Sequence, residues 1–121
     1  MNKNKDKPPP WFSTGNRKAS IIHARMRMLC SPLAEHLYSF IHVVDTPVCD
    51  CGFRRENNKH FLLECPLYQD ERTLMLEKLN LIGFSPLLKN LLFGNEKYEE
   101  NKNKQAFETI QEFINQTGRF N

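Results

Sequence analysis

Residues 49–66 read CDCGFRRENNKHFLLECP. This stretch contains three of the chain's four cysteines and one of its four histidines, with the spacing Cys-x-Cys-x8-His-x4-Cys. Proteins bind zinc through four such ligands in a tetrahedron, because thiolate and imidazole suit this borderline-soft ion. We therefore predict one structural Zn²⁺ ion with the ligands Cys49, Cys51, His60 and Cys65.

The backbone around these residues favours the same ligand set. Gly52 follows the first pair and can take the positive φ that a tight knuckle needs. In a continuous helix, His60 and Cys65 would lie roughly 140° apart around the axis. Pro66 disfavours the helical conformation of Cys65. We therefore expect a short helix from about Lys59 to end at Cys65, so that this thiolate can turn back towards the ion.

Two other interpretations of the cysteines stay open. The first pair is closer together than the common spacing of two to four residues. The cysteines can instead be small buried apolar side chains, with His60 a hydrogen-bonded polar residue. They can also form a disulfide, but the sequence has no signal peptide that would indicate an oxidising compartment.

Several runs along the chain carry the likeness to a known family. They are residues 49–52 (CDCG), residues 60–68 (HFLLECPLY) with residues 71–72 (ER), the upstream runs 25–28 (RMRM) and 31–37 (SPLAEHL), and the ending 116–120 (QTGRF). From about residue 17 onwards, they resemble the C-terminal CCHC zinc-binding segment that follows the reverse transcriptase domain in non-LTR retrotransposon proteins. The run His-x4-Cys-Pro-x-Tyr is the most specific part. The chain is thus similar to the tail of a much larger protein.

Chain length makes a metal ion valuable here. A chain of 121 residues forms one domain at most. So short a chain buries proportionally little surface, which leaves its core marginal without a further constraint. Structural zinc contributes on the order of 10–16 kcal/mol in small peptides, coupled to folding. If zinc binds, we expect it to decide whether the central part folds.

Charge is distributed unevenly. Residues 1–30 carry seven Lys or Arg against the single Asp6, whereas residues 31–121 carry ten against thirteen Asp or Glu. Attraction to RNA or DNA therefore belongs mostly to the front of the chain, although a solvated basic surface is the other interpretation. The candidate nucleic-acid-binding residues are Lys3, Lys5, Lys7, Arg17, Lys18, Arg25 and Arg27, together with Arg54 and Arg55 in the knuckle loop.

Residues 1–16 show no amphipathic period and contain Pro8-Pro9-Pro10, which favours an extended conformation. We predict a disordered basic arm whose deletion leaves thermal stability nearly unchanged. Trp11 and Phe12 can stack on a base or dock on the body of the protein, and docking is favoured. Residues 17–121 form the predicted helical zinc-binding domain.

Apolar residues recur at helical spacing along this domain. They predict helices over about 17–29, from Pro32 with Ser31 as N-cap, over about 68–80, from Pro86, and over about 99–117. In the third of these, Leu67, Leu74, Leu76, Leu79 and Leu81 are the expected apolar residues. Cys30 lies outside the ligand spacing and is expected in the core. The predicted fold is mostly α: a small helical domain with a zinc knuckle inserted between helices and a disordered N-terminal arm.

No catalytic motif is recognised. There is no nucleophile–base pair or Gly-rich phosphate loop, and Leu62 stands where a zinc deaminase has its glutamate. Four protein ligands leave the ion no open position for water, so we expect no enzyme activity from this chain alone. Two functions stay open. The first is a nucleic-acid-binding accessory domain with RNA or DNA as its partner. The second is a structural or protein-interaction zinc module, a remnant fragment of such an element without nucleic-acid binding of its own, which contacts other segments of a retroelement protein. With no apolar run near the ~20 residues of a membrane span, we expect a soluble intracellular protein of the cytoplasm or nucleus that is not secreted.

Overall fold

The computed structural model describes residues 7–121, and this part of the chain is helical without strands. Its helices are α1 (Arg17–Arg27), α2 (Ala34–His36), α3 (Gln69–Leu81), α4 (Leu88–Phe93) and α5 (Glu100–Thr117). Tighter or wider turns occur at Pro10–Ser13 and Pro66–Tyr68, which are 3₁₀, and at Leu37–Ile41 and His60–Glu64, which are π-helical. The predicted mostly α fold, with the cysteine-rich segment between helices, is confirmed. Between residues 7 and 121, no helix combines the length and apolar character that a bilayer crossing requires.

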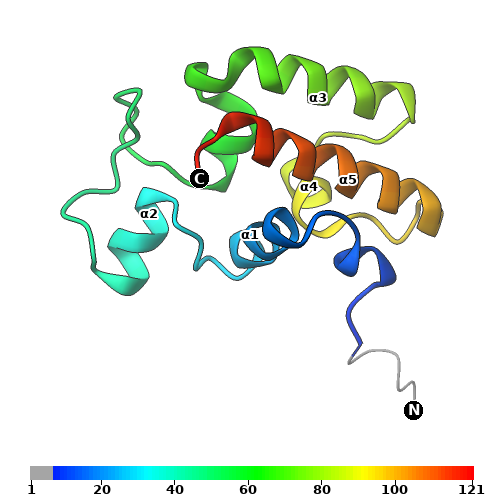
Figure 1. Cartoon of the computed structure of the whole chain (residues 1–121), viewed down its shortest axis with the longest axis horizontal. Helices are drawn as coiled ribbons and strands as arrows, with labels where there is room; N and C mark the ends of the chain where they lie inside the picture. The colour runs from blue at the N-terminus through cyan, green and yellow to red at the C-terminus, as the bar shows by residue number, and fades with distance from the viewer. Residues whose placement is uncertain (1–6) are drawn as a thin grey trace.

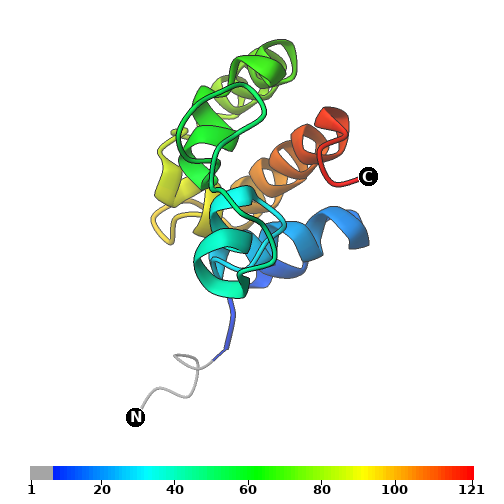
Figure 2. The same ribbon diagram turned by 90° about the vertical axis from the view of Figure 1, so that its left-hand side faces the viewer.

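Helix α5 is the centre of the core. Its buried residues include Ala106, Phe107, Ile110, Phe113 and Ile114, which follow one another at steps of one, three and three, then one and so form one face. Helix α3 runs antiparallel to α5 on one side (Figure 1). Seen from the end, α5 lies between α3 and α1 (Figure 2). The C-terminus of α5 thereby reaches the segment that carries the cysteines.

Helix α3 packs through a face that matches the expected one only in part: Leu76 and Leu79 pack against the core as predicted. Leu67, Leu74 and Leu81 are exposed, whereas Met75 and Leu79 are buried together with Arg72. Residues 72, 75 and 79 follow at steps of three and four, so a long basic side chain occupies a core position. The spacing of the leucines gives no indication of this buried arginine.

The second helix begins two residues later than predicted. Leu33 is extended, and the Ala34 N–H donates to a carboxylate oxygen of Glu56 at 2.8 Å. Ser31 is therefore not the N-cap. Its hydroxyl accepts a hydrogen bond from the Leu33 N–H at 3.2 Å. A side chain from the knuckle loop, distant in sequence, supplies the cap instead.

The prediction that residues 1–16 form a disordered arm is wrong for the part that includes Trp11 and Phe12. Pro10–Ser13 forms a 3₁₀ turn in which Trp11 is 7% exposed. The indole Nε1 donates to the Phe93 carbonyl at 2.9 Å, and Phe12 stacks on Phe107 with 5.9 Å between ring centroids. Docking on the body is therefore confirmed for these two aromatic residues, because burying them removes a large apolar surface from water. The rest of the prediction, for residues 1–6, lies outside the described residues.

Candidate metal centre

The four predicted ligands come together in space. The ligand atoms of Cys49, Cys51, His60 and Cys65 all lie within 4.8 Å of one another. The Cys49 and Cys65 sulfurs are 3.7 Å apart, close to the edge of about 3.8 Å expected for a tetrahedron with Zn–S bonds of about 2.3 Å. The same distance is far too long for a disulfide, and all three cysteines are free. The arrangement is consistent with one metal site.

A tight turn presents the first pair. Gly52 has φ +98°, as predicted, and its N–H donates to the Cys49 carbonyl at 2.8 Å. The Phe53 N–H points to the Cys51 sulfur at 3.4 Å. A backbone N–H directed at a thiolate stabilises its negative charge. The knuckle therefore places both sulfurs, and the Phe53 N–H favours the ionised form of Cys51.

A π-helical turn presents the second pair. The Cys65 N–H donates to the His60 carbonyl at 2.7 Å, which closes the turn between residues five apart. Cys65 itself is extended, with φ −63° and ψ 123°, as Pro66 predicts. The wider turn removes the angular mismatch of an α-helix, so the helix end and the π turn together let both side chains face one centre.

Arg72 supports the end of this turn. Its guanidinium donates to the carbonyls of Phe61, Leu62 and Cys65 at 2.8–3.0 Å, and the residue is 3% exposed. Carbonyls at a helix end lack intrahelical partners, and a buried arginine satisfies three of them at once. Arg72 thus holds the backbone of Cys65 in place from the neighbouring helix α3.

The surroundings of the thiols fit a cation. Burial raises the pKa of the Cys49 thiol to about 12, and burial also raises the pKa of Cys65. Neighbouring buried thiolates are unfavourable on their own, and a divalent ion between them reverses that preference. Burial lowers the pKa of His60, against the opposing charges of Glu64 and Glu56. The imidazole is therefore neutral near pH 7, as metal ligation requires.

His60 shows how its ring would be used. Its Nε2 lies 3.2 Å from the Cys51 sulfur, on the ligand side of the cluster. Its Nδ1 is buried without a hydrogen bond from residues 7–121, with the Glu64 carboxylate 3.8 Å away. Metal-bound histidines usually donate their second N–H to a carboxylate. The Phe53 ring stacks on the imidazole at 4.4 Å between centroids and covers its face.

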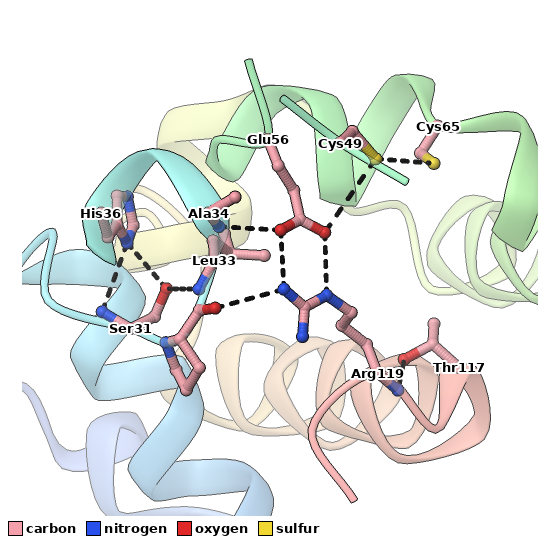
Figure 3. Close-up of polar contacts among 10 residues, drawn as sticks. Ser31, Leu33, Ala34, His36, Cys49, Glu56, Cys65, Thr117 and Arg119 are labelled. Carbon is pink, nitrogen blue, oxygen red and sulfur yellow. Dashed lines mark hydrogen bonds and ion pairs between the residues drawn. The ribbon is translucent and has the colours of Figure 1, made fainter. Parts of the chain in front are cut away.

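A buried ion pair lies beside the cluster (Figure 3). Arg119 donates two hydrogen bonds to the Glu56 carboxylate, at 2.7 and 2.8 Å, and one to the Pro32 carbonyl at 3.2 Å. The second Glu56 oxygen lies 4.0 Å from the Cys49 sulfur. Glu56 therefore joins three parts of the chain: the knuckle, the start of α2 and the tail after α5.

Glu56, Arg72 and Arg119 were not among the residues predicted for the site. For Arg72, the spacing to Met75 and Leu79 was an available signal. Arg119 belongs to the terminal run QTGRF that carried the family resemblance, but nothing local indicates its partner. Glu56 lies in a polar loop and is only 3% exposed because α2 and the tail cover it.

The candidate nucleic-acid-binding residues have different environments. Arg17, Lys18, Arg25 and Arg54 are exposed, although Lys18 also bonds Asn121. Arg55 is exposed and pairs with Glu35 at 2.9 Å, Lys7 is exposed, and Lys3 and Lys5 lie outside the described residues.

Arg27 is the exception among these candidates. Its guanidinium donates to the Leu92 carbonyl at 3.1 Å and lies 4.0 Å above the Phe12 ring. These contacts hold the arm against α4, so Arg27 has a packing role. Its predicted phosphate contact stays a prediction.

Cys30 is half-buried and stands apart from the metal-ligand cluster. The prediction that it is not a ligand agrees with this placement. It is not part of the main buried cluster that contains Phe61 and Phe107, so the expected core position is not observed.

Similarity to known proteins is limited to part of the chain. A stretch of 38 residues is 53% identical to a retrovirus-related Pol polyprotein from the type-1 retrotransposable element R1 of Bradysia coprophila. The match spans 29% of this chain and 4% of the polyprotein. No protein-family model matches the chain, and no solved structure does.

Proposed function

We propose that this chain is a non-catalytic accessory unit of a retrotransposon Pol protein, that it corresponds to the CCHC segment following the reverse transcriptase domain, and that it binds RNA or DNA. The partial similarity to an R1 Pol polyprotein supports the family assignment. The run from Cys49 to Tyr68, with its Cys-x-Cys-x8-His-x4-Cys spacing, supports the correspondence to the CCHC segment.

One observation carries the proposal: four Cys and His ligand atoms gathered within 4.8 Å. Three sulfurs and one nitrogen favour zinc over harder cations such as Mg²⁺ and Ca²⁺, which take oxygen ligands. Four protein ligands close the coordination shell, as in structural zinc sites. The ion therefore has a stabilising role, and the chain has no catalytic role of its own.

Nucleic-acid binding is supported by unpaired basic residues at two places. Arg17 and Arg25 are exposed on α1, and Arg54 is exposed in the knuckle loop. None of the three makes an ion pair within residues 7–121. Exposed cations of this kind neutralise phosphates and release counterions.

A second function is favoured by three arginines whose side chains form hydrogen bonds within the protein. Arg27, Arg72 and Arg119 all use their guanidinium groups inside the protein. The remaining surface after residue 30 is net acidic. In this alternative, the zinc site stabilises the helices, and the unit contacts other segments of a retroelement protein without binding nucleic acid.

The two functions are separated by one experiment on the zinc-loaded chain. Native mass spectrometry first checks for one equivalent of zinc, which we expect to be lost in His60→Ala and Cys65→Ser and kept in Cys30→Ala. Binding to a labelled RNA is then measured by fluorescence anisotropy over a range of salt. We expect affinity to fall steeply between about 50 and 200 mM salt.

Two results would contradict the proposal. Zinc retained by His60→Ala with an unchanged fold would refute the ligand set. Zinc bound as expected, but no RNA or DNA binding even at about 50 mM salt, would leave the structural or interaction module.

A further inference from the structure

A groove lies where the arm meets the end of α4, and none of the Cys/His cluster residues lines it. Its volume is about 430 Å³, and its lining includes Pro9, Trp11 and Phe12 from the arm and Lys89, Phe93 and Lys97 from α4 and the following loop. A second hollow of about 350 Å³ shares Pro9 and Trp11 with it and extends to Lys7. We call the two together the arm groove.

The floor of the arm groove is rigidly built. Trp11 is held by the hydrogen bond from its indole to the Phe93 carbonyl. Gly94 has φ +72°, and a Cβ there would lie 2.3 Å from the indole nitrogen. Any other residue at this position would be strained and would displace Trp11. The close approach of Gly94 therefore sets the position of the indole.

The rim combines an aromatic ring with cations. Phe93 is 44% exposed, although it is the last residue of α4, in which Leu91 and Leu92 are buried. Lys7, Lys89 and Lys97 are exposed, and within residues 7–121 none of them pairs with a carboxylate. Glu96 is the one acidic residue of the lining. The net charge of the lining is positive.

An exposed aromatic ring beside unpaired lysines matches the chemistry of a single nucleic-acid strand, which presents a flat apolar base and a negative phosphate in each residue. A duplex hides its base faces, and an acidic peptide would use the lysines but not the ring. We propose that the arm groove binds single-stranded nucleic acid, with a base against Phe93 and the indole edge and with phosphates near Lys89 and Lys97. This inference rests on the proposed nucleic-acid function and names a site for it outside the residues expected from the sequence.

The protein contains a built-in reporter for this site, because Trp11 is its only tryptophan. We would titrate the zinc-loaded chain with oligouridylate and oligothymidylate of about 12 nucleotides and follow tryptophan emission alongside anisotropy of the labelled strand. We expect quenching that saturates together with the anisotropy change. Comparing the two strands also distinguishes RNA from DNA as the source of the ligand.

Substitutions then test the contacts. Phe93→Ala should weaken binding about tenfold, the effect of losing one stacked base, and circular dichroism checks that this half-exposed residue is not needed for folding. Lys89→Gln with Lys97→Gln should weaken binding and reduce its salt dependence. The control is Lys78→Gln with Lys104→Gln, which removes the same charge from two half-exposed positions outside the groove, where the lysines pair with Glu112 and Glu100. Glu96→Gln should strengthen binding.

The outcomes separate this inference from the function on which it rests. If anisotropy reports binding while Trp11 emission is unchanged, and if the Lys89/Lys97 variant binds like its control, the strand binds elsewhere and the groove is excluded as the site. If an acidic peptide or a duplex quenches Trp11 as well as the single strand does, the base-stacking assignment is wrong. If no strand binds at about 50 mM salt, the proposed nucleic-acid function itself fails.

Discussion

Glu56 and Arg119 lie 63 residues apart in the chain and form the main charged contact beside the cysteines. The Glu56 side chain is 4% exposed and that of Arg119 is 25% exposed. Three thiolates, a neutral imidazole and Zn²⁺ would together carry one negative charge, to which Glu56 adds another. Arg72 and Arg119 are cations that offset these two charges, and the Glu64 carboxylate near His60 lies 3.8 Å from Lys59.

Replacement of Arg119 tests this balance. Arg119→Ala leaves the Glu56 carboxylate buried beside Cys49 without its partner, and we expect the zinc-loaded protein to lose about 3 kcal/mol of unfolding free energy. Arg119→Lys keeps the charge but not the two-bond geometry of the guanidinium, so its unfolding free energy should lie between those of wild type and Arg119→Ala. Urea denaturation gives the measurement, with the exposed Arg54→Ala as control within about 0.5 kcal/mol of wild type. Equal midpoints for Arg119→Ala and Arg54→Ala would show that the pair contributes nothing.

At the scale of elements, the π turn and the proline after it decide how the side chains of His60 and Cys65 are placed relative to each other. The hydrogen bond from the Cys65 N–H to the His60 carbonyl gives the turn its width. Pro66 keeps Cys65 extended, and Arg72 holds the freed carbonyls. The first two contributions come from the turn itself, whereas Arg72 comes from helix α3. The placement of His60 and Cys65 therefore depends on how the turn and α3 pack together.

Pro66→Ala should weaken zinc binding without unfolding the protein. Pro66 is exposed, so its removal creates no cavity, but Cys65 gains access to the helical region. We expect the zinc Kd to rise about two- to fivefold, which corresponds to the ~0.4–1 kcal/mol that a well-placed proline contributes. Competition with a chromophoric chelator measures this change. Pro86→Ala, also exposed and far from the cluster in sequence, is the control, and equal Kd values for the two variants would rule out the role of Pro66.

At the scale of the whole molecule, α5 connects the arm with the segment that carries the cysteines. Its buried face contacts the arm through Phe107 and the cysteine segment through Phe113, whose ring lies 5.4 Å from that of Phe61. The tail beyond α5 then returns to the cluster, where Phe120 packs on Phe61 at 5.3 Å. Arm, core and metal centre therefore share one set of aromatic contacts.

Truncation tests how much the docked arm stabilises the fold. Deleting residues 1–16 removes Trp11 and Phe12, and losing a buried aromatic residue costs about 3–5 kcal/mol, so we expect Tm to fall by about 10 °C or more. This reverses the expectation that the arm is dispensable for stability. Deleting residues 1–6 alone should leave Tm nearly unchanged, and thermal circular dichroism measures both. Equal melting of the two truncated chains would mean that the docked aromatic residues add no stability.

Much of the fold follows from local sequence rules. The stripe of α5 and its end at Gly118, which has φ +65°, follow from helical spacing and from the freedom of glycine. The extended Cys65 follows from Pro66. The members of the Cys/His cluster could be predicted because zinc sites use few residue types. His60 was the histidine that lies between the cysteines in the sequence.

The sequence by itself determined the helical class, the four residues of the Cys/His cluster and the turn at Gly52, because each depends on residues close together in the chain. Only the tertiary structure decided the burial of Trp11, the internal use of Arg27 and Arg72, and the contact between Glu56 and Arg119. These outcomes depend on which surfaces meet after the helices pack. An exposed arginine and a buried one look alike in the local sequence. For Arg119, the difference is determined by Glu56, which lies 63 residues away in the chain.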